Sequence, residues 1–420
     1  MATRILNGIR DYVHHLRFQR NAWLYLFSTI ISGVSLGVFN LLFNFYIKSL
    51  GYEADLIGTL LTVSSLSSLL GALPAGYLSD RLGRKNALLL ASAVVSLSVL
   101  GIVAWNNVAW FFAMNVLRGL ASSLAGVTIG PFLMENSGQK ERTYLFSFNQ
   151  GIQTLAGSVA NWGGGQLPTL LANTMGYKVD SAPAYAGSIL VIAGISVLAL
   201  VPLLLLVRQP TAHQRGEAML SPFQYAYRQP GTLARLISPQ LITSLGAGLL
   251  IPFLNLFFNE VHQRPVAEVG RLFSYGSLAM GIGLLLAPPL AERFGKIRIV
   301  VITQALSIPF LILLGFAPWY WVSAIAFLVR AALMNMSSPV YNAFVMEEVE
   351  PEARATVASL ASMSWNFGWT FSPTISGWVQ VNYGFSPLFI GTITTYVTAI
   401  WMYWRFFLRK RKRKEIKGEA

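Results

Sequence analysis

Cysteine is absent from the 420 residues of this chain, which excludes a disulfide framework, a thiol nucleophile and a thiolate metal site. Carboxylates are few, with 17 Asp and Glu against 31 Lys and Arg, and each falls in a predicted loop, tail or helix end. The histidines, His14, His15, His213 and His262, also lie outside the long apolar segments. A membrane enzyme would need a nucleophile, a base or a metal cluster, and the sequence shows no such constellation. We therefore predict a protein that is not an enzyme and that holds no metal or cofactor.

Long apolar segments occupy most of the chain. Apolar residues make up 54% of the composition and charged residues 11%, which predicts an all-α membrane protein. A helix needs about 20 mostly apolar residues to cross a bilayer. Twelve such segments are present, six in each half, at residues 22–48, 55–79, 86–105, 107–134, 141–171, 183–207, 232–260, 266–291, 297–316, 318–346, 352–380 and 384–408.

Polar stretches divide the chain further. Residues 208–231 contain three prolines and predict a cytoplasmic linker between two six-helix bundles, at 22–207 and 232–408. Residues 1–21 are basic and carry apolar residues at helical spacing, which fits either an amphipathic helix on the membrane surface or an irregular basic tail. Residues 409–420 predict a basic cytoplasmic tail.

The formal net charge of +14 follows the loops. Lys and Arg concentrate in the tails and in alternate loops, which is the positive-inside pattern and predicts a plasma (inner) membrane protein with both termini in the cytoplasm. The exceptions are Arg118 and Arg330 inside apolar segments, and Lys48, Lys178, Arg264 and Arg271 in or beside loops of opposite sidedness. We therefore attribute the charge to topology and to anionic lipids at the basic tails. We expect no nucleic-acid partner and a monomeric protein.

The two halves are repeats of one another. One constant offset in residue number relates Arg118 to Arg330, Met134-Glu135 to Met346-Glu347, Arg142 to Arg354, Gly58 to Gly270 and Gly165 to Gly377. An uninterrupted register across most of each half predicts two bundles of like orientation. Membrane transporters built this way bind substrate between the halves near the middle of the membrane.

A polar loop between the second and third segments carries the most specific motif, Gly76-Tyr77-Leu78-Ser79-Asp80-Arg81-Leu82-Gly83-Arg84-Lys85. Gly83 can take a positive φ between two helices, and Asp80 and Arg84 are four apart, so they can pair across one helical turn. The order Gly-x-x-x-Asp-Arg-x-Gly-Arg-Lys resembles the loop between spans 2 and 3 of the major facilitator superfamily of transporters. The repeat places Glu292, Arg293, Gly295 and Lys296 at the equivalent positions, with Pro288 in place of Gly76.

Glutamate and arginine are separated by six residues at Glu135 and Arg142, and again at Glu347 and Arg354. This spacing resembles a feature of the sugar-porter branch of the superfamily, in which it pairs with the span 2–3 loop to close the cytoplasmic side. The resemblance implies two latches. One consists of Asp80, Arg84, Glu135 and Arg142, and the other of Glu292, Lys296, Glu347 and Arg354. These charges either gate the protein or merely hold helix ends together. If they gate it, Asp80→Asn should favour the inward-open state.

Arg118 and Arg330 have no acidic neighbour within their apolar segments. Proton-coupled sugar porters pair an Asp in span 1 with an Arg in span 4, whereas this chain has Asn40 at the approximate place of that Asp. Like the facilitators of that branch, which also have Asn there, the chain is expected to transport without an intramembrane carboxylate as proton carrier. Each arginine then bonds either to amide and hydroxyl groups of other helices or to an anionic substrate group.

Uncharged polar and aromatic residues recur at helical spacing in several segments. In a membrane helix such residues either join helices or line a cavity, and their clustering here favours a substrate cavity. The candidates are Asn40, Asn44, Gln150, Thr154, Asn161, Asn255, Asn259, Asn335, Tyr341, Trp365, Asn366 and Trp369.

Two partial resemblances leave the branch open. Leu145-Phe-Ser147-Phe-Asn149-Gln150 is similar to the entry of span 5 in sugar porters, in which the Gln binds sugar, but other marks of that branch are missing. Gly163-Gly164-Gly165 after Ala160-Asn161 stand where drug antiporters carry Gly-Pro. We expect efflux of a neutral or amphipathic compound by alternating access. The alternatives are uptake of a neutral solute such as a sugar, transport of an organic anion by Arg118 and Arg330, and a non-transporting receptor or scaffold.

Overall fold

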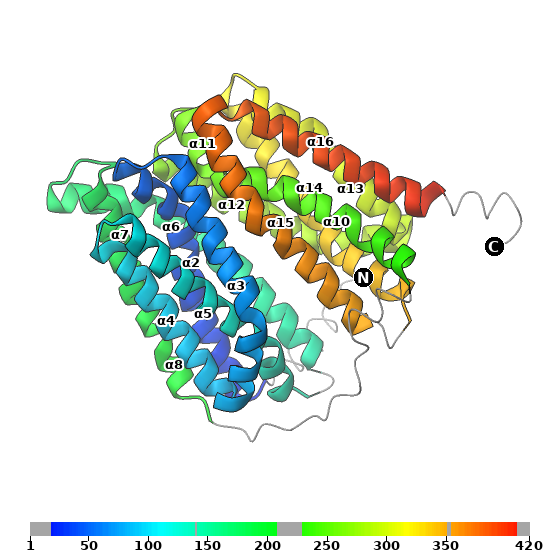
Figure 1. The fold of residues 1–420 in the computed structure, drawn as a ribbon, viewed down its shortest axis with the longest axis horizontal. Helices are drawn as coiled ribbons and strands as arrows, with labels where there is room; N and C mark the ends of the chain where they lie inside the picture. Colours follow the sequence, from blue (N-terminus) through cyan, green and yellow to red (C-terminus); the bar gives the residue numbers. More distant parts are fainter. Residues whose placement is uncertain (1–17, 139–140, 208–228, 351–353, 410–420) are drawn as a thin grey trace, which may run out of the picture. The chain divides into compact units, whose positions relative to one another are not determined.

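The computed structural model describes residues 18–138, 141–207, 229–350 and 354–409, and they are helical almost throughout, with no strand in these ranges (Figure 1). The predicted all-α fold with twelve spans is confirmed. The basic N-terminal segment before residue 18, for which a helix was one of two expectations, lies outside the described residues. So do most of the linker, the tail after residue 409 and the side chains of Arg142 and Arg354.

The chain divides into two compact units, residues 1–50 with 66–213 and residues 51–65 with 214–420. The helices before the linker are α2 (Arg20–Ser49), α3 (Ala54–Leu82), α4 (Arg84–Ala104), α5 (Val108–Glu135), α6 (Arg142–Met175), α7 (Ala182–Leu198) and α8 (Leu200–Leu204). After the linker come α10 (Pro230–Leu250), η1 (Ile251–Phe253), α11 (Leu254–Glu260), α12 (Val266–Phe294), α13 (Lys296–Phe316), α14 (Tyr320–Glu348), α15 (Arg354–Tyr383), α16 (Ser386–Tyr403) and η3 (Trp404–Leu408).

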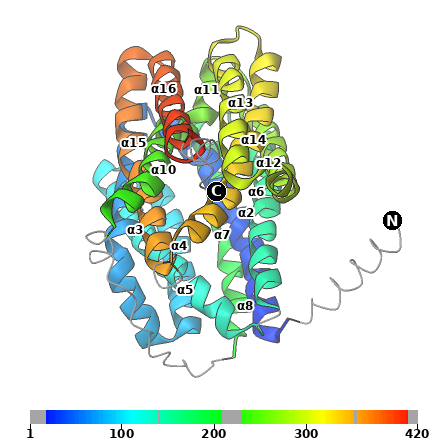
Figure 2. The same cartoon turned by 90° about the vertical axis from the view of Figure 1, so that its right-hand side faces the viewer.

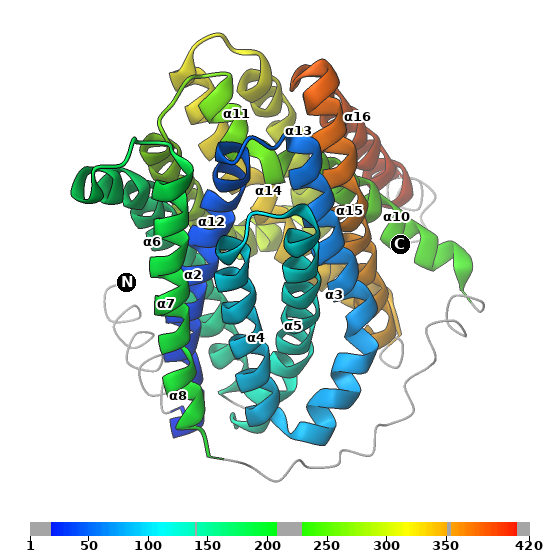
Figure 3. The same ribbon diagram turned by 60° about the vertical axis from the view of Figure 1, so that its left-hand side comes forward.

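In the first unit, α2 packs against α6 and α7, and α4 packs against α5, which lies beside it in Figure 3. A Cβ on Gly33 of α2 would lie 2.9 Å from the Cβ of Ala156 on α6, so the absence of a side chain lets these helices approach closely. An apolar core that includes Tyr25, Leu26 and Phe132 joins α2 to α5.

In the second unit, α10 packs along α15 and α16, and α14 packs along α12 and α13 (Figure 2). The pairing of α10 with α15 is equivalent, in the sequence repeat, to the pairing of α2 with α6. Residues 51–65 join this unit because the first half of α3 lies against α15. A Cβ on Gly58 would be 2.9 Å from the carbonyl carbon of Pro373, and the hydroxyl of Thr374 donates to that of Thr62 at 2.8 Å.

Nine of the described helices qualify as membrane spans by length and hydropathy alone. The helices α6, α15 and α16 do not, because Ser and Thr interrupt the apolar residues of all three, and Asn and Gln also interrupt those of α6 and α15. Two of these three, α6 and α15, carry predicted cavity residues. Polar residues on a membrane helix must be shielded from lipid, so these positions are expected to face protein or water.

Candidate functional site

The polar loop predicted between α3 and α4 is a tight connection through one residue, Gly83. Its φ of +79° is a left-handed value that a residue with a side chain rarely adopts. Arg84 therefore begins α4 directly after α3 ends, and its side chain turns toward the end of α5. In the second unit Gly295 repeats this geometry, with a φ of +88° between α12 and α13.

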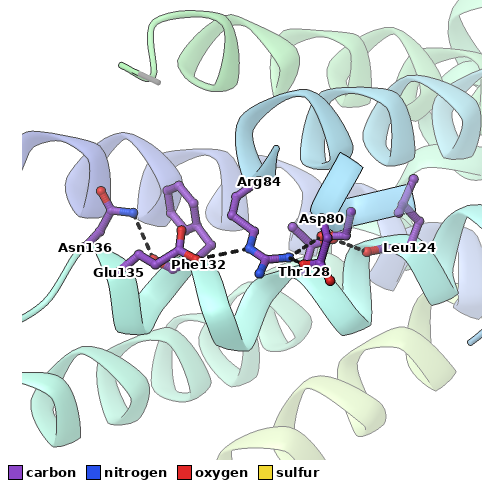
Figure 4. Close-up of polar contacts among 8 residues, drawn as sticks. Asp80, Arg84, Leu124, Thr128, Phe132, Glu135 and Asn136 are labelled. Carbon is purple, nitrogen blue, oxygen red and sulfur yellow. Dashed lines mark hydrogen bonds and ion pairs between the residues drawn. The ribbon is translucent and has the colours of Figure 1, made fainter. Parts of the chain in front are cut away.

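Arg84 joins three side chains at this end of the first unit (Figure 4). Its guanidinium lies 2.6 Å from the carboxylate of Asp80 and 3.2 Å from that of Glu135. It also donates to the hydroxyl of Ser79 at 2.8 Å, which in turn accepts from Thr128 at 2.9 Å. Arg84 thus connects the end of α3, the start of α4 and the end of α5.

The two ion pairs of Arg84 differ in their exposure to solvent. The side chain of Arg84 is 17% exposed and that of Glu135 is 22% exposed, whereas that of Asp80 is 67% exposed. Solvent screens an exposed pair strongly, and such pairs contribute about 0–1 kcal/mol. The pair with Glu135 is therefore the more important of the two for the stability of this cluster.

A pocket of about 100 Å³ adjoins the cluster. One of its walls is the start of α4 and another is the end of α5. Inside it the amide of Asn136 donates to the carbonyl of Phe132 at 2.8 Å, while its own buried oxygen has no hydrogen-bond partner. The lining residues are Leu82, Gly83, Arg84, Lys85, Asn86, Phe132, Glu135, Asn136 and Val207.

Two further residues, which sequence reasoning missed, anchor the last residues before the linker. Lys85 donates from Nζ to the carbonyl oxygens of Leu204 and Leu206, at 2.6 Å each. Asn21 exchanges two hydrogen bonds of 3.0 Å with the backbone of Val207. The only sequence signal for Lys85 was its position in the loop motif, and for Asn21 there was none.

In the second unit, Lys296 at the start of α13 pairs with Glu347 at the end of α14. This contact is the repeat equivalent of Arg84 with Glu135. Within the described part of the chain, Glu292 makes no ion pair, and Arg293 lies over the ring of Phe294 at 5.4 Å. Of the other residues in the loop motif, Gly76 is half-buried and Arg81 is exposed, both in the last turns of α3.

Arg118 and Arg330 occupy equivalent positions near the middle of α5 and α14 but differ in their surroundings. Arg118 lies over the ring of Phe39 at 5.1 Å and donates to the side-chain oxygen of Asn115 at a long 3.5 Å. Arg330 is 4% exposed and donates to the hydroxyl of Tyr396 at 3.2 Å. The Nε atom of each is buried without a partner, and no carboxylate lies within 4 Å of either across the described ranges.

The predicted cavity residues of the first unit lie on α2 and α6. Asn40 and Gln150 are exposed, and Thr154 is half-buried with its hydroxyl donating to the Gln150 carbonyl at 3.0 Å. Asn44 is buried, and Asn161 is half-buried. Arg118 contacts Asn115 and Phe39 rather than Asn40, so the structure does not place Asn40 as a direct replacement for a carboxylate partner.

The predicted cavity residues of the second unit divide into two groups. Trp365 and Asn366 of α15 are exposed, and Trp369 is half-buried with its indole N–H buried and unpartnered. Asn335 is half-buried, and its amide donates to the Ala331 carbonyl of its own helix. These residues remain candidates for contact with a substrate.

The other group is engaged elsewhere. Tyr341 packs in the apolar core, and its hydroxyl donates to the carbonyl of Leu236 on α10. Asn259 donates to the Arg264 carbonyl at 2.8 Å and so holds the loop after α11. Asn255 is buried and accepts from the backbone N–H of Leu256. We leave these three residues out of the proposed site because their side chains make these contacts within the protein. Helical periodicity alone did not indicate which face of each helix packs inward.

Gln240 and Ser364 were not predicted as site residues. The side-chain oxygen of each is buried and has no hydrogen-bond partner. Gln240 and Ser364 lie within about one turn of a contact between the packed helices α10 and α15, because Ser244, one turn after Gln240, donates to the Ser364 carbonyl. Neither residue belonged to a repeated polar pattern, so the sequence alone gave no signal for them.

Comparison with known proteins gives consistent matches. The model of the Major Facilitator Superfamily matches residues 25–237 and 236–420. The multidrug resistance protein MdtG of Dickeya zeae is 22% identical over 422 residues, which cover 96% of this chain and 98% of that protein. The putative metabolite transport protein YwtG of Bacillus subtilis is 29% identical over 138 residues, 32% of this chain and 30% of that protein. A point variant of the nucleoside transporter NupG has a similar fold, with a TM-score of 0.75 at 16% identity over 92% of this chain and 100% of that chain.

Proposed function

Because the chain belongs to the major facilitator superfamily, we propose that it exports a small amphipathic compound, drug-like or metabolite, by rocker-switch alternating access. We place it in the plasma (inner) membrane as a monomer with both termini in the cytoplasm and with anionic lipids at its basic tails. The family assignment is to transporters, and the direction, substrate and mechanism are our proposals.

The repeated charge cluster carries the proposal. Arg84 with Glu135 in the first unit, and Lys296 with Glu347 in the second, join the start of one helix to the end of the next at equivalent positions. The same contact at equivalent positions of both units fits a two-state transporter, which needs contacts that form in one state and separate in the other. The pair of Arg84 with Glu135 is the better shielded of the two, because Glu347 is 61% exposed, and a shielded charge pair can bias such an equilibrium by a few kcal/mol.

The candidate cavity residues are polar but uncharged, which supports a substrate that need not carry a positive charge. Gln150, Trp365 and Asn366 are exposed on α6 and α15, whose polar residues must be shielded from lipid, and Asn40 is an exposed amide on the apolar α2. Amides offer both donors and acceptors, and indole rings offer apolar surface together with an N–H donor. Such a set suits compounds that combine an apolar body with a few polar groups.

The described helices contain no carboxylate in their central turns; each acidic residue of α3, α5, α12 and α14 lies near a helix end. We therefore propose that coupling to protons, if it occurs, uses Glu135 or Glu347 at the helix ends. Export is favoured over import because MdtG, named for multidrug resistance, matches along nearly the whole chain. Import or facilitated diffusion of a neutral solute is the second candidate, supported by exposed Gln150 and by the resemblance around it.

A counterflow assay in proteoliposomes tests the proposal. Saturable exchange of a lipophilic drug or a metabolite is expected, and its absence over a broad panel of compounds would favour a receptor or scaffold.

Thiol labelling can show to which side of the membrane the protein opens. The chain has no cysteine, so a single Thr154→Cys or Trp365→Cys variant needs no further substitutions. If the charge cluster closes the cytoplasmic side, Asp80→Asn and Glu135→Gln should raise labelling from that side, and unchanged labelling would contradict the gating role.

A further inference from the structure

Arg118 carries a charge that the described residues do not neutralise. A guanidinium has five N–H donors. One of them reaches Asn115 at 3.5 Å, which is the long limit of a hydrogen bond, and the ring of Phe39 covers one face. The Nε atom is sealed from solvent without a partner. No carboxylate in the described ranges lies within 4 Å.

The depth of Arg118 makes this arrangement costly. It lies about ten residues into the 28-residue α5, which at ~1.5 Å per residue is roughly 15 Å from the end of the helix. The apolar core of a bilayer is about 30 Å thick, so the guanidinium is near the middle of the membrane. A charge at that depth faces a water-filled space or a partner rather than lipid.

The equivalent arginine of the second unit is arranged differently. Arg330 is 4% exposed. Its guanidinium lies over the ring of Tyr396 and donates a hydrogen bond to the hydroxyl of that residue. Gly246 of α10 leaves room for the Tyr396 ring, since a Cβ there would lie 3.0 Å from it. Arg330 is therefore enclosed within its own unit, whereas the Arg118 residue is only half-buried.

From this difference we infer that Arg118 is a binding residue for the carboxylate of an amphipathic substrate, and that Arg330 is a structural residue. A guanidinium binds a carboxylate through two parallel hydrogen bonds. The contact with the Phe39 ring uses none of the N–H donors, and one long hydrogen bond to Asn115 uses one of five, so donors remain for the ligand. A single cation balances one negative charge, which favours a monocarboxylate over a phosphate that would bring up to two. One part of this inference, the apolar body of the substrate, rests on the proposed function.

A matched pair of ligands tests the inference. Naphthaleneacetate and naphthaleneacetamide share one apolar body and differ in charge, and acetate is the control for a small anion without that body. With the purified full-length protein, naphthaleneacetate is expected to raise the thermal unfolding midpoint at lower concentration than the amide, and acetate is expected to have no effect. In Arg118→Gln the affinity for naphthaleneacetate should fall roughly tenfold to a hundredfold, as expected for loss of hydrogen bonds between charged groups. Binding of the amide should stay unchanged.

Arg330→Gln is the matched control variant. It is expected to lower the unfolding midpoint of the free protein while leaving the affinity for naphthaleneacetate within about twofold of wild type, a change below ~0.5 kcal/mol. Equal responses of wild type and Arg118→Gln to naphthaleneacetate would overturn the inference. So would a loss of carboxylate affinity in Arg330→Gln as large as that in Arg118→Gln.

A second measurement uses the wild-type protein and stays informative if Arg118→Gln does not fold. Phenylglyoxal modifies arginine, and mass spectrometry reports the modification of the peptide that contains Arg118. Naphthaleneacetate should slow this modification and the amide should not, and equal rates with both would overturn the inference.

Counterflow of the amide by wild type separates the two hypotheses, export and carboxylate binding at Arg118. If the amide exchanges but carboxylate protection is missing, the export function stands and the role of Arg118 fails. Protection of Arg118 without any exchange would support the site and contradict export.

Discussion

At the residue scale, Arg84 shows that the exposure of a charged partner decides how much an ion pair contributes. Its contact with Asp80 is the shorter, at 2.6 Å against 3.2 Å to Glu135. Asp80 is nevertheless largely exposed, and exposed pairs contribute little because water and salt screen them. Distance alone would therefore rank the two partners in the wrong order.

We expect Glu135→Gln to destabilise the protein by about 1–3 kcal/mol, because it leaves the half-buried Arg84 without its better-shielded partner. Asp80→Asn should cost less than about 1 kcal/mol. Thermal unfolding in detergent, in low and high salt, measures both. A larger loss for Asp80→Asn than for Glu135→Gln would show that the exposed contact is the stronger one.

His262, in the loop between α11 and α12, gives a prediction for pH. Its ring lies against Phe257 and Phe258 at 5.2 and 5.8 Å between centroids, and near Tyr320. Burial, and secondly the charge of Arg264, lower the pKa of His262 below its ordinary value of about 6.5. The folded state therefore prefers the neutral ring, and protonation favours the unfolded state.

The contribution of His262 to stability should be complete above about pH 6.5, the ordinary pKa, and should decrease as the pH falls from there toward the lower pKa of the folded state. His262→Phe keeps an aromatic ring in the same surroundings and removes the titration. Glu268, which pairs with Arg264 of this loop, and Arg271, which pairs with Glu268, are present in both proteins. The difference in unfolding midpoint between wild type and variant should thus change between pH 7 and pH 5. Parallel curves over that range would exclude the coupling.

At the scale of elements, the helix contacts depend on glycines at particular crossings. Gly368 of α15 faces α10 so closely that a Cβ would lie 2.6 Å from the backbone nitrogen of Leu245. Real Cβ atoms do not approach backbone at that distance, so α10 and α15 would have to separate. In contrast, a Cβ on Gly163 of α6 would meet no atom within 4 Å.

We predict that Gly368→Ala destabilises the protein by about 1–3 kcal/mol through overpacking. Gly163→Ala, the matched control, should be neutral or stabilising by up to ~1 kcal/mol, because alanine favours the helix. Unfolding midpoints and the yield of monodisperse protein measure both effects. If the two substitutions behave alike, the close approach of α10 and α15 is not a requirement of the fold.

The sequence predicted the helices more completely than the site. Hydropathy and the internal repeat located all twelve spans. Tyr341 and Asn259 show the limit. Their spacing is compatible with a cavity face, but Tyr341 bonds to the backbone of α10 and Asn259 bonds to the following loop. Periodicity identifies a face of a helix, whereas its partner depends on tertiary packing, which one sequence does not specify.

At the scale of the whole molecule, the two charge clusters belong to different units and share no residue. Substitutions at sites that are distant and share no partner usually have additive effects on stability, within about 0.5 kcal/mol. The combination of Glu135→Gln with Glu347→Gln should therefore lower stability by the sum of the single losses. A much larger loss would indicate direct coupling between the clusters in the folded protein.

Transport should respond differently from stability if both clusters control one conformational step. Either single substitution then shifts the same two-state equilibrium, so the combined shift is the product of the two single factors in the equilibrium constant. The counterflow rate follows the population of the less favoured state, and it should fall steeply once the equilibrium has moved past its midpoint.

We therefore expect modest losses of counterflow in Glu135→Gln and in Glu347→Gln. The double variant should lose more than the product of the two single losses. Initial rates at matched protein density in proteoliposomes measure this, and Gly163→Ala serves as the control. A double variant no slower than the slower single variant would mean that the two clusters do not act on the same step.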